Sequence, residues 1–259
     1  MKRIIFITGF ISFLFSAGNA FALHPLITDD AGTMGKGKAQ IETGGQYSYD
    51  KERIEDGVTQ KIQGGQVSAT LTYGIVDGVD LVLGIPYLWS KTREDDAVTF
   101  RTDGFSDISF DLKWRFHEKD GWGFAIKPGI TVPTGDDDRE LGTGGVSYRL
   151  YGIVTKEMEP WAFHLNIGYA RNENTLEQEK NLWHASIAAE VEMVKSLKAV
   201  ADFSLDRNTT KDSDTPLTYV IGGLVYAISE KVSVDGGVKI GLTRPSTDIT
   251  YLLGLTMKF

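Results

Sequence analysis

The sequence predicts an all-β protein, a closed antiparallel transmembrane β-barrel of about 12 strands that follow one another as an up-and-down meander. Three observations support this fold class. Apolar side chains recur at every second residue along most of the chain, the links between these runs alternate between long and short, and glycine is frequent, at 29 of 259 residues. A mean hydropathy of -0.16 excludes a polytopic helical membrane protein, because each spanning helix needs about 20 mostly apolar residues.

The first 22 residues have the pattern of a secretory signal peptide. Lys2 and Arg3 give a positive start, an apolar run covers residues 4–15, and Ala20-Phe21-Ala22 is a small-residue cleavage site. We therefore expect cleavage of residues 1–22, with an uncleaved membrane anchor as the alternative.

The next segment, residues 23–37, carries turn formers and the adjacent acids Asp29 and Asp30, and it does not fit a strand. We expect a periplasmic strap or a plug inside the barrel, and a flexible terminus is the simpler alternative. The barrel itself is expected to occupy residues 38–259.

The expected strands are the runs with a period of two. In the last run, Tyr251, Leu253 and Leu255 alternate with Thr250 and Leu252. The strands are expected at residues 38–50, 62–74, 79–91, 104–116, 122–133, 145–155, 160–171, 181–193, 197–207, 216–228, 231–242 and 248–259.

The links between these strands fall into two classes. Those at 51–61, 92–103, 134–144, 172–180 and 208–215 are long and polar, whereas those at 76–78, 117–121, 156–159, 194–197 and 229–230 are short. This rhythm is typical of outer-membrane barrels, which have large outside loops and tight periplasmic turns. A secreted β-sandwich or two small β-domains would explain the alternation but not the rhythm.

Barrel width decides which face of the strands is internal. Eight strands already enclose a space that side chains can fill, so a barrel of twelve is too wide for an apolar filling. The polar face is therefore expected to line the lumen. The expected lumen-lining residues are Asp107, Asp111, Lys113, Arg115, Lys127, Arg149, His164, His184, Glu190, Glu192, Lys198, Asp202, Asp235 and Lys239. They would form either a polar constriction that selects small solutes or an ion network that braces the wall.

Two expected strands, 79–91 and 216–228, are apolar on both faces. One hypothesis is an apolar track for solute, and the alternative is contact with an inserted loop or the N-terminal segment. The residues expected to face inward are Val82, Pro86, Leu88, Val220, Leu224 and Tyr226.

Aromatic residues gather at strand ends, as in the girdles of membrane barrels. The short-turn girdle is expected to contain Tyr73, Trp114, Phe116, Trp122, Phe124, Trp161 and Phe163. The long-loop girdle is expected to contain Tyr47, Tyr49, Tyr87, Trp89, Phe105, Tyr148, Tyr169, Trp183, Tyr219 and Tyr251.

The composition also bears on chemistry. The chain has no Cys, which excludes disulfides and thiolate metal sites, and its net charge of -8 argues against nucleic-acid binding. We expect no enzyme activity, cofactor or metal. A Ser-His-Asn group of His164, Asn166, His184 and Ser186, metal binding by the two histidines, and Ca²⁺ binding by residues 136–138 are the alternatives.

The last strand resembles the carboxy-terminal assembly signal of Gram-negative outer-membrane barrels, through Tyr251, Leu253, Leu255, Met257 and the terminal Phe259. This resemblance implies the outer-membrane assembly machinery and a lipid bilayer as partners.

Three further stretches resemble an outer-membrane family named for the meta-pathway of phenol degradation, and the likeness spans the mature chain. They are His24-Pro25-Leu26-Ile27-Thr28-Asp29-Asp30, Gly104-Phe105-Ser106-Asp107-Ile108 and Lys127-Pro128-Gly129-Ile130-Thr131-Val132-Pro133. The resemblance implies a channel or transporter for small solutes, aromatic or hydrophobic ones included, in the outer membrane of a Gram-negative bacterium. The alternatives are a structural or surface-interaction barrel without transport and, more remotely, an outer-membrane hydrolase.

Overall fold

A computed structural model gives the architecture, and it describes residues 25–53, 57–211 and 213–259. The expected signal peptide, residues 1–22, lies outside these ranges. The strands are β1 (Ala39–Arg53), β2 (Thr59–Val76), β3 (Val79–Glu94), β4 (Ala97–Phe105), β5 (Ile108–Lys119), β6 (Trp122–Val132), β7 (Ser147–Met158), β8 (Trp161–Arg171), β9 (Asn181–Val194), β10 (Leu197–Asp206), β11 (Leu217–Ala227), β12 (Val232–Gly241) and β13 (Ile249–Lys258). In the described part of the chain, no helix is long and apolar enough to cross a membrane.

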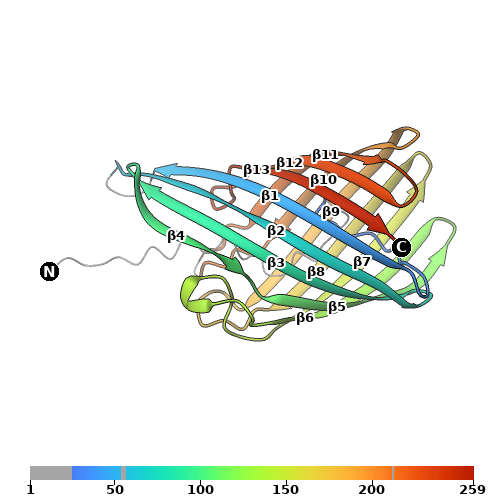
Figure 1. Cartoon of the computed structure of the whole chain (residues 1–259), viewed down its shortest axis with the longest axis horizontal. Helices are drawn as coiled ribbons and strands as arrows, with labels where there is room; N and C mark the ends of the chain where they lie inside the picture. The colour runs from blue at the N-terminus through green and yellow to red at the C-terminus, as the bar shows by residue number, and fades with distance from the viewer. Residues whose placement is uncertain (1–24, 54–56, 212) are drawn as a thin grey trace.

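These strands close into one antiparallel barrel (Figure 1). Apart from β4 and β5, each strand pairs with its neighbours along the chain, and β1 pairs with both β2 and β13. The half of β3 nearer the long loops pairs with β4, where Tyr87 lies opposite Phe105. The half nearer the short turns pairs with β5, where Gly84 lies opposite Ser109. Strands β4 and β5 therefore share one position in the wall, and the barrel has twelve positions, which confirms the predicted fold class.

The break between β4 and β5 falls at Ser106 and Asp107. The Asp107 carboxylate accepts hydrogen bonds from the backbone N–H groups of Gly135 and Thr143, at 2.9 and 2.7 Å. These bonds attach the link after β6 to the wall, and they replace strand pairing at this point.

Two of the predicted long links are wrong. Residues 51–53, 59–61, 92–94 and 97–103 are strand, because β1 to β4 continue beyond the ends of the other strands, as Figure 1 shows at the left. The β3–β4 hairpin turns at Asp95 and Asp96, whose φ values of 45° and 70° fit the tight hairpin turn with two left-handed residues.

Side-chain exposure alternates along the strands in the predicted sense. Outward residues such as Phe105 and Leu253 are 66% and 71% exposed, whereas inward ones such as Lys127 and Asp202 are 1% and 3% exposed. An apolar exterior and a polar interior are what a bilayer-spanning barrel requires.

The predicted facing of β11 is wrong. Val220, Leu224 and Tyr226 are exposed and point outward, whereas Tyr219 and Ile221 are buried, so Tyr219 does not belong to the long-loop girdle. Because β11 is apolar on both faces, alternation gives no polar marker from which to choose. On β3 the predicted facing holds, since Val82 and Leu88 are buried.

Candidate functional site in the barrel lumen

Residues 25–37, which we name the lumen segment, run inside the barrel and hydrogen-bond to inward side chains. Asp202 on β10 accepts the N–H groups of Ile27 and Thr28 at 2.9 and 2.7 Å. On β8, Asn166 Oδ1 accepts the N–H of Asp29 at 2.7 Å, and Asn166 Nδ2 donates to the Asp29 carbonyl at 2.8 Å. The side chains of the wall thus satisfy backbone groups that have no strand partner.

The lumen segment then continues across the interior to strands on the opposite side of the barrel. The Ala31 N–H donates to Thr155 Oγ1 on β7 at 2.8 Å, and the Met34 N–H donates to Asp80 on β3 at 3.0 Å. At the short-turn rim the Lys36 N–H donates to Asp77 at 3.0 Å. Partners on β3, β7, β8 and β10 show that the segment crosses the lumen.

Apolar contacts accompany these hydrogen bonds. Leu26 packs with Ala188 and Val200, and Ala31 lies in a cluster with Tyr151 and Ile153. All six side chains are less than 9% exposed, so the lumen segment is packed as part of the interior.

Asp29 is the electrostatic centre of the lumen. Its carboxylate accepts Lys113 Nζ at 3.0 Å and Lys127 Nζ at 2.9 Å, and all three side chains are buried. Lys113 also lies 3.6 Å from Asp30. The Gly32 N–H donates to the Asp30 carboxylate as well, so a cation and a backbone donor both lie beside this group.

A second buried ion pair joins β5 to β7. Arg149 donates to Asp111 through Nε and Nη2 at 2.8 and 2.7 Å, a bidentate geometry, and through Nη1 to Thr131 at 2.7 Å. The intervening strand carries Gly129, and a Cβ there would lie 1.9 Å from Asp111 Oδ1. The missing side chain therefore makes room for the pair.

The predicted residues nearer the short turns form a looser group. Glu190 pairs with Lys198 at 2.9 Å and lies 3.8 Å from His164 Nε2, while His164 Nδ1 shares a hydrogen bond with Thr155. Arg115 pairs with Glu118 at 3.1 Å. Glu192 is exposed and lies opposite Lys198 on the neighbouring strand.

The long loops pack on one another at the outer end. Thr175 donates its N–H to the Thr143 carbonyl at 2.9 Å, and Glu179 donates its N–H to the Thr209 carbonyl at 2.8 Å. Leu141 in this cap is 1% exposed. Asp137, one of the three acids considered for Ca²⁺, accepts a hydrogen bond from Thr175 at 2.8 Å.

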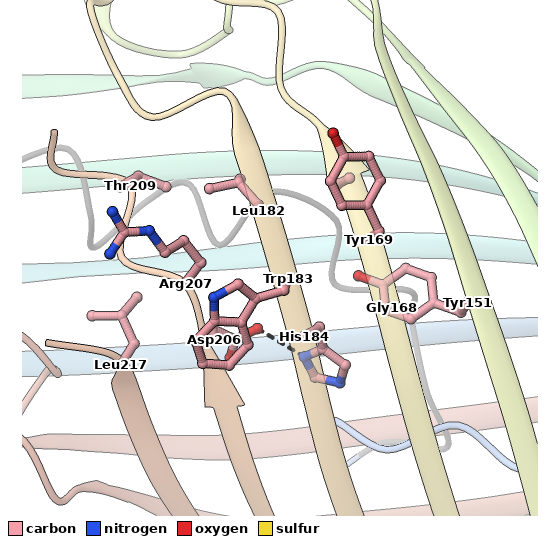
Figure 2. Close-up of a pocket in the computed structure, with 11 residues that line it drawn as sticks. Tyr151, Gly168, Tyr169, Leu182, Trp183, His184, Asp206, Arg207, Thr209 and Leu217 are labelled. Atoms are coloured by element: carbon pink, nitrogen blue, oxygen red, sulfur yellow. Dashed lines mark hydrogen bonds and ion pairs between the residues drawn. The ribbon is translucent and has the colours of Figure 1, made fainter. Parts of the chain in front are cut away.

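His184 lies between the Asp206 carboxylate, which Figure 2 shows beside it, and the Ser186 hydroxyl. Its Nδ1 is 2.7 Å from Asp206 Oδ1 and its Nε2 is 2.9 Å from Ser186 Oγ, with the Tyr151 ring packed edge-on against the imidazole. A cavity of about 20 Å³, lined by Tyr151 and Asp206 among others, adjoins the group and is large enough for one water molecule.

The predicted Ser-His-Asn alternative is wrong in its members, because the Asn166 amide binds Asp29 and Asp206 takes its place beside His184. Acyl transfer also needs N–H donors for an oxyanion. Ser186 lies in register between Asn166 and Ser204 in the middle of the sheet, where backbone N–H groups are used in the ladder.

Two predicted residues lie on β12. Asp235 is buried, and Lys239 Nζ lies 4.9 Å from the centre of the Tyr219 ring, a cation–π distance. Within the described ranges, no group of three or more His, Asp or Glu side chains is placed to hold a metal ion.

The sequence alone did not single out Asp80 and Asp206, which hold polar contacts inside the barrel. Asn166 and Ser186 were expected only as members of the catalytic alternative, and Asp29 and Asp30 only as part of a possible plug, without their partners. Asp80 was detectable, because it lies two residues before Val82 on the face predicted to point inward.

A closed twelve-position antiparallel meander with an apolar exterior and a charged interior defines an outer-membrane β-barrel of the Gram-negative type. Residues 24–259 match the family described as "Putative MetA-pathway of phenol degradation", and the chain belongs to this family.

Solved structures resemble the chain in fold. The COG4313 outer membrane channel from Pseudomonas putida F1 is 15% identical with a TM-score of 0.68, over 89% of this chain and 98% of that one. The NanC porin is 10% identical with a TM-score of 0.56, over 85% and 100%. The KdgM porin is 9% identical with a TM-score of 0.55, over 85% and 99%. Comparison with curated proteins gives no match.

Proposed function

We propose that the protein is an outer-membrane channel for small solutes and that the lumen segment is a removable plug of this channel. The interior is lined by buried charges of both signs, which a polar solute can contact once the lumen segment has moved. The solved structures of similar fold, one named as a channel and two as porins, support the same function.

The observation that carries the proposal is the position of Asp29 between Lys113 and Lys127. The segment is held by hydrogen bonds and ion pairs, which can exchange for water or for a solute. When Asp29 leaves, two ammonium groups face the lumen at one level. A carboxylate on a solute can then occupy the place of the Asp29 carboxylate.

This arrangement favours small carboxylates, aromatic acids included, over neutral solutes of equal size. When the segment moves, Leu26 and Ala31 no longer cover apolar wall residues such as Val200 and Ile153. The uncovered wall residues can then contact an aromatic ring of the solute. We propose no enzyme activity, because the His184 group lacks a nearby oxyanion site.

The test is uptake of benzoate and of benzyl alcohol by proteoliposomes that contain the full mature chain. We expect faster uptake of benzoate than of benzyl alcohol relative to empty liposomes. The double variant K113Q/K127Q should lose this preference, whereas K119Q/K231Q, which removes two exposed lysines near the short turns, should keep it.

Absence of uptake of either solute above the level of empty liposomes, in the wild-type chain and in D29N, would reject the channel. That outcome would favour the structural or surface-interaction barrel instead.

A further inference from the structure

Strands β1 to β4 reach past the other strands at the long-loop end (Figure 1), and the outward face of this extension is basic. Its cations, which we name the basic patch, are Lys51, Lys61, Lys91, Arg93 and Arg101. They are exposed or half-buried, whereas the alternate residues Ser90, Thr92 and Thr102 are buried on the inner face.

The register of the sheet places these cations side by side. Lys51 lies directly opposite Lys61, and Lys61 lies opposite Arg93. One row nearer the membrane, Lys91 lies opposite Arg101. Like charges directly opposite one another on a sheet are destabilising, so three such pairs on one face call for an external anion.

Local acids neutralise only part of this charge. Asp96 contacts Lys61 at 2.7 Å from the hairpin tip, where its side chain is 80% exposed, and Arg93 donates to the neutral Gln63. Asp103 lies on the same outward face two residues from Arg101, and its carboxylate accepts a hydrogen bond from Tyr87 at 3.0 Å. In the described part of the chain, no ion pair involves the side chain of Lys91 or Arg101. The surplus is notable in a chain with a net charge of -8.

The height of the basic patch relative to the membrane indicates its ligand. Tyr87 and Phe105 pack edge-on at 5.3 Å on the outward face, at the level of the outer aromatic girdle. Lys91 lies four residues beyond Tyr87 and Arg101 four residues before Phe105, which places both about 13 Å further out. Charged groups of the outer leaflet lie just beyond an aromatic girdle.

From these positions we infer that the basic patch binds the phosphate groups of a phosphorylated glycolipid of the outer leaflet, of the lipopolysaccharide type. The two rows of cations present paired donors to adjacent anionic groups, and the aromatic residues below them lie beside the acyl chains. This binding does not depend on transport through the lumen.

The test is binding of purified lipid A to the full mature chain in a neutral detergent, followed by native mass spectrometry. The variant K91Q/R101Q should weaken binding of phosphorylated lipid A about 30-fold, because each cation near a charged lipid surface contributes about fivefold. The charge-preserving swap K91R/R101K should bind within about twofold of the wild type.

The matched control is K119Q/K231Q, which removes the same charge at the short-turn rim and should leave lipid A binding unchanged. Dephosphorylated lipid A and phosphatidylethanolamine should bind the wild type and K91Q/R101Q equally weakly. All these residues are outward and exposed or half-buried, so heat-modifiable migration in gels should show that each variant is folded.

Equal affinity of the wild type and K91Q/R101Q for phosphorylated lipid A would overturn the inference, as would equal losses in the test and control variants. Equal binding of phosphorylated and dephosphorylated lipid A would also overturn it, because phosphate would then not be the recognised group.

Discussion

Single residues inside the barrel decide whether its buried charges are compensated. Lys113, Lys127, Asp111 and Arg149 are all less than 9% exposed, and each has its partner at hydrogen-bond distance. Removing one member of such a pair leaves a buried charge alone, which typically costs about 3–5 kcal/mol. The lumen is therefore sensitive to substitutions that a solvated surface would tolerate.

The substitution D29N should release the lumen segment, because it leaves Lys113 and Lys127 without their shared carboxylate. We expect the backbone amides of Ile27, Thr28 and Ala31 to exchange with deuterium at least about tenfold faster than in the wild type. Hydrogen exchange with mass spectrometry of the N-terminal peptide measures this. D30N is the control, since Asp30 is partly exposed and 3.6 Å from Lys113, and it should have a smaller effect. Equal protection in D29N and the wild type would contradict this role of Asp29.

The substitution G129A should destabilise the barrel by about 1–3 kcal/mol, because the new Cβ would lie 1.9 Å from Asp111 Oδ1 and would displace the Arg149 pair. Denaturant unfolding in detergent, followed by tryptophan fluorescence, measures the change. G222A is a matched control on β11, where a Cβ meets nothing within 4 Å. The interpretation fails if both variants unfold at the same denaturant concentration.

For single residues, the sequence predicts whether a side chain faces the lumen, but it does not predict which side chain it binds there. Alternation places Lys113 and Lys127 on the inward face, because the neighbouring Trp114 and Ile126 are apolar. Their partner Asp29 lies 84 and 98 residues away in the chain, and no local pattern connects a turn-rich segment to two strands at that separation.

Among the elements, β13 has a double role, since it pairs with β12 and closes the barrel on β1. The Phe259 N–H donates to the Ala39 carbonyl at 2.9 Å, and the Phe259 side chain is 64% exposed. An exposed aromatic at the closing edge is what the predicted assembly signal requires, and we propose that the assembly machinery binds it.

The substitution F259A should therefore lower the amount of assembled barrel in the outer membrane severalfold, with less effect on stability once the barrel has formed. Heat-modifiable migration of outer-membrane fractions quantifies the assembled form. W183A removes an outward aromatic on β9 that is 43% exposed, and this variant should assemble normally. Normal assembly of F259A, or an equal defect in W183A, would show that Phe259 is not part of the signal.

Element boundaries follow from the sequence wherever one face meets lipid. Expected strands such as 160–171 and 181–193 agree with β8 and β9 to within one residue at each end. The extension of β1 to β4 was not predicted, because beyond the membrane both faces carry polar residues and the period of two disappears. The predicted facing of β11 was wrong for the opposite reason. Both faces of this strand are apolar, so the sequence does not show which face points into the lumen.

Considered as a whole, the molecule is a barrel filled by its own N-terminal segment and capped by its long loops. Width alone predicts a polar lumen, but the path of the lumen segment depends on Asp202, Asn166, Thr155 and Asp80, which come from four strands. A filled lumen implies that the wild-type channel conducts ions poorly until the segment moves.

The most direct test of the removable plug is the ion conductance of a variant in which the lumen segment is tethered. In A31C/G123C the Cβ atoms would start about 3.1 Å apart, so a shift of a few tenths of an ångström brings them to the 3.5–4.5 Å separation of a disulfide, and the chain has no other cysteine. In planar bilayers we expect the oxidised variant to stay closed and a reductant to restore wild-type openings. Equal conductance of the oxidised and reduced variant, once mass spectrometry has verified the disulfide, would contradict the plug.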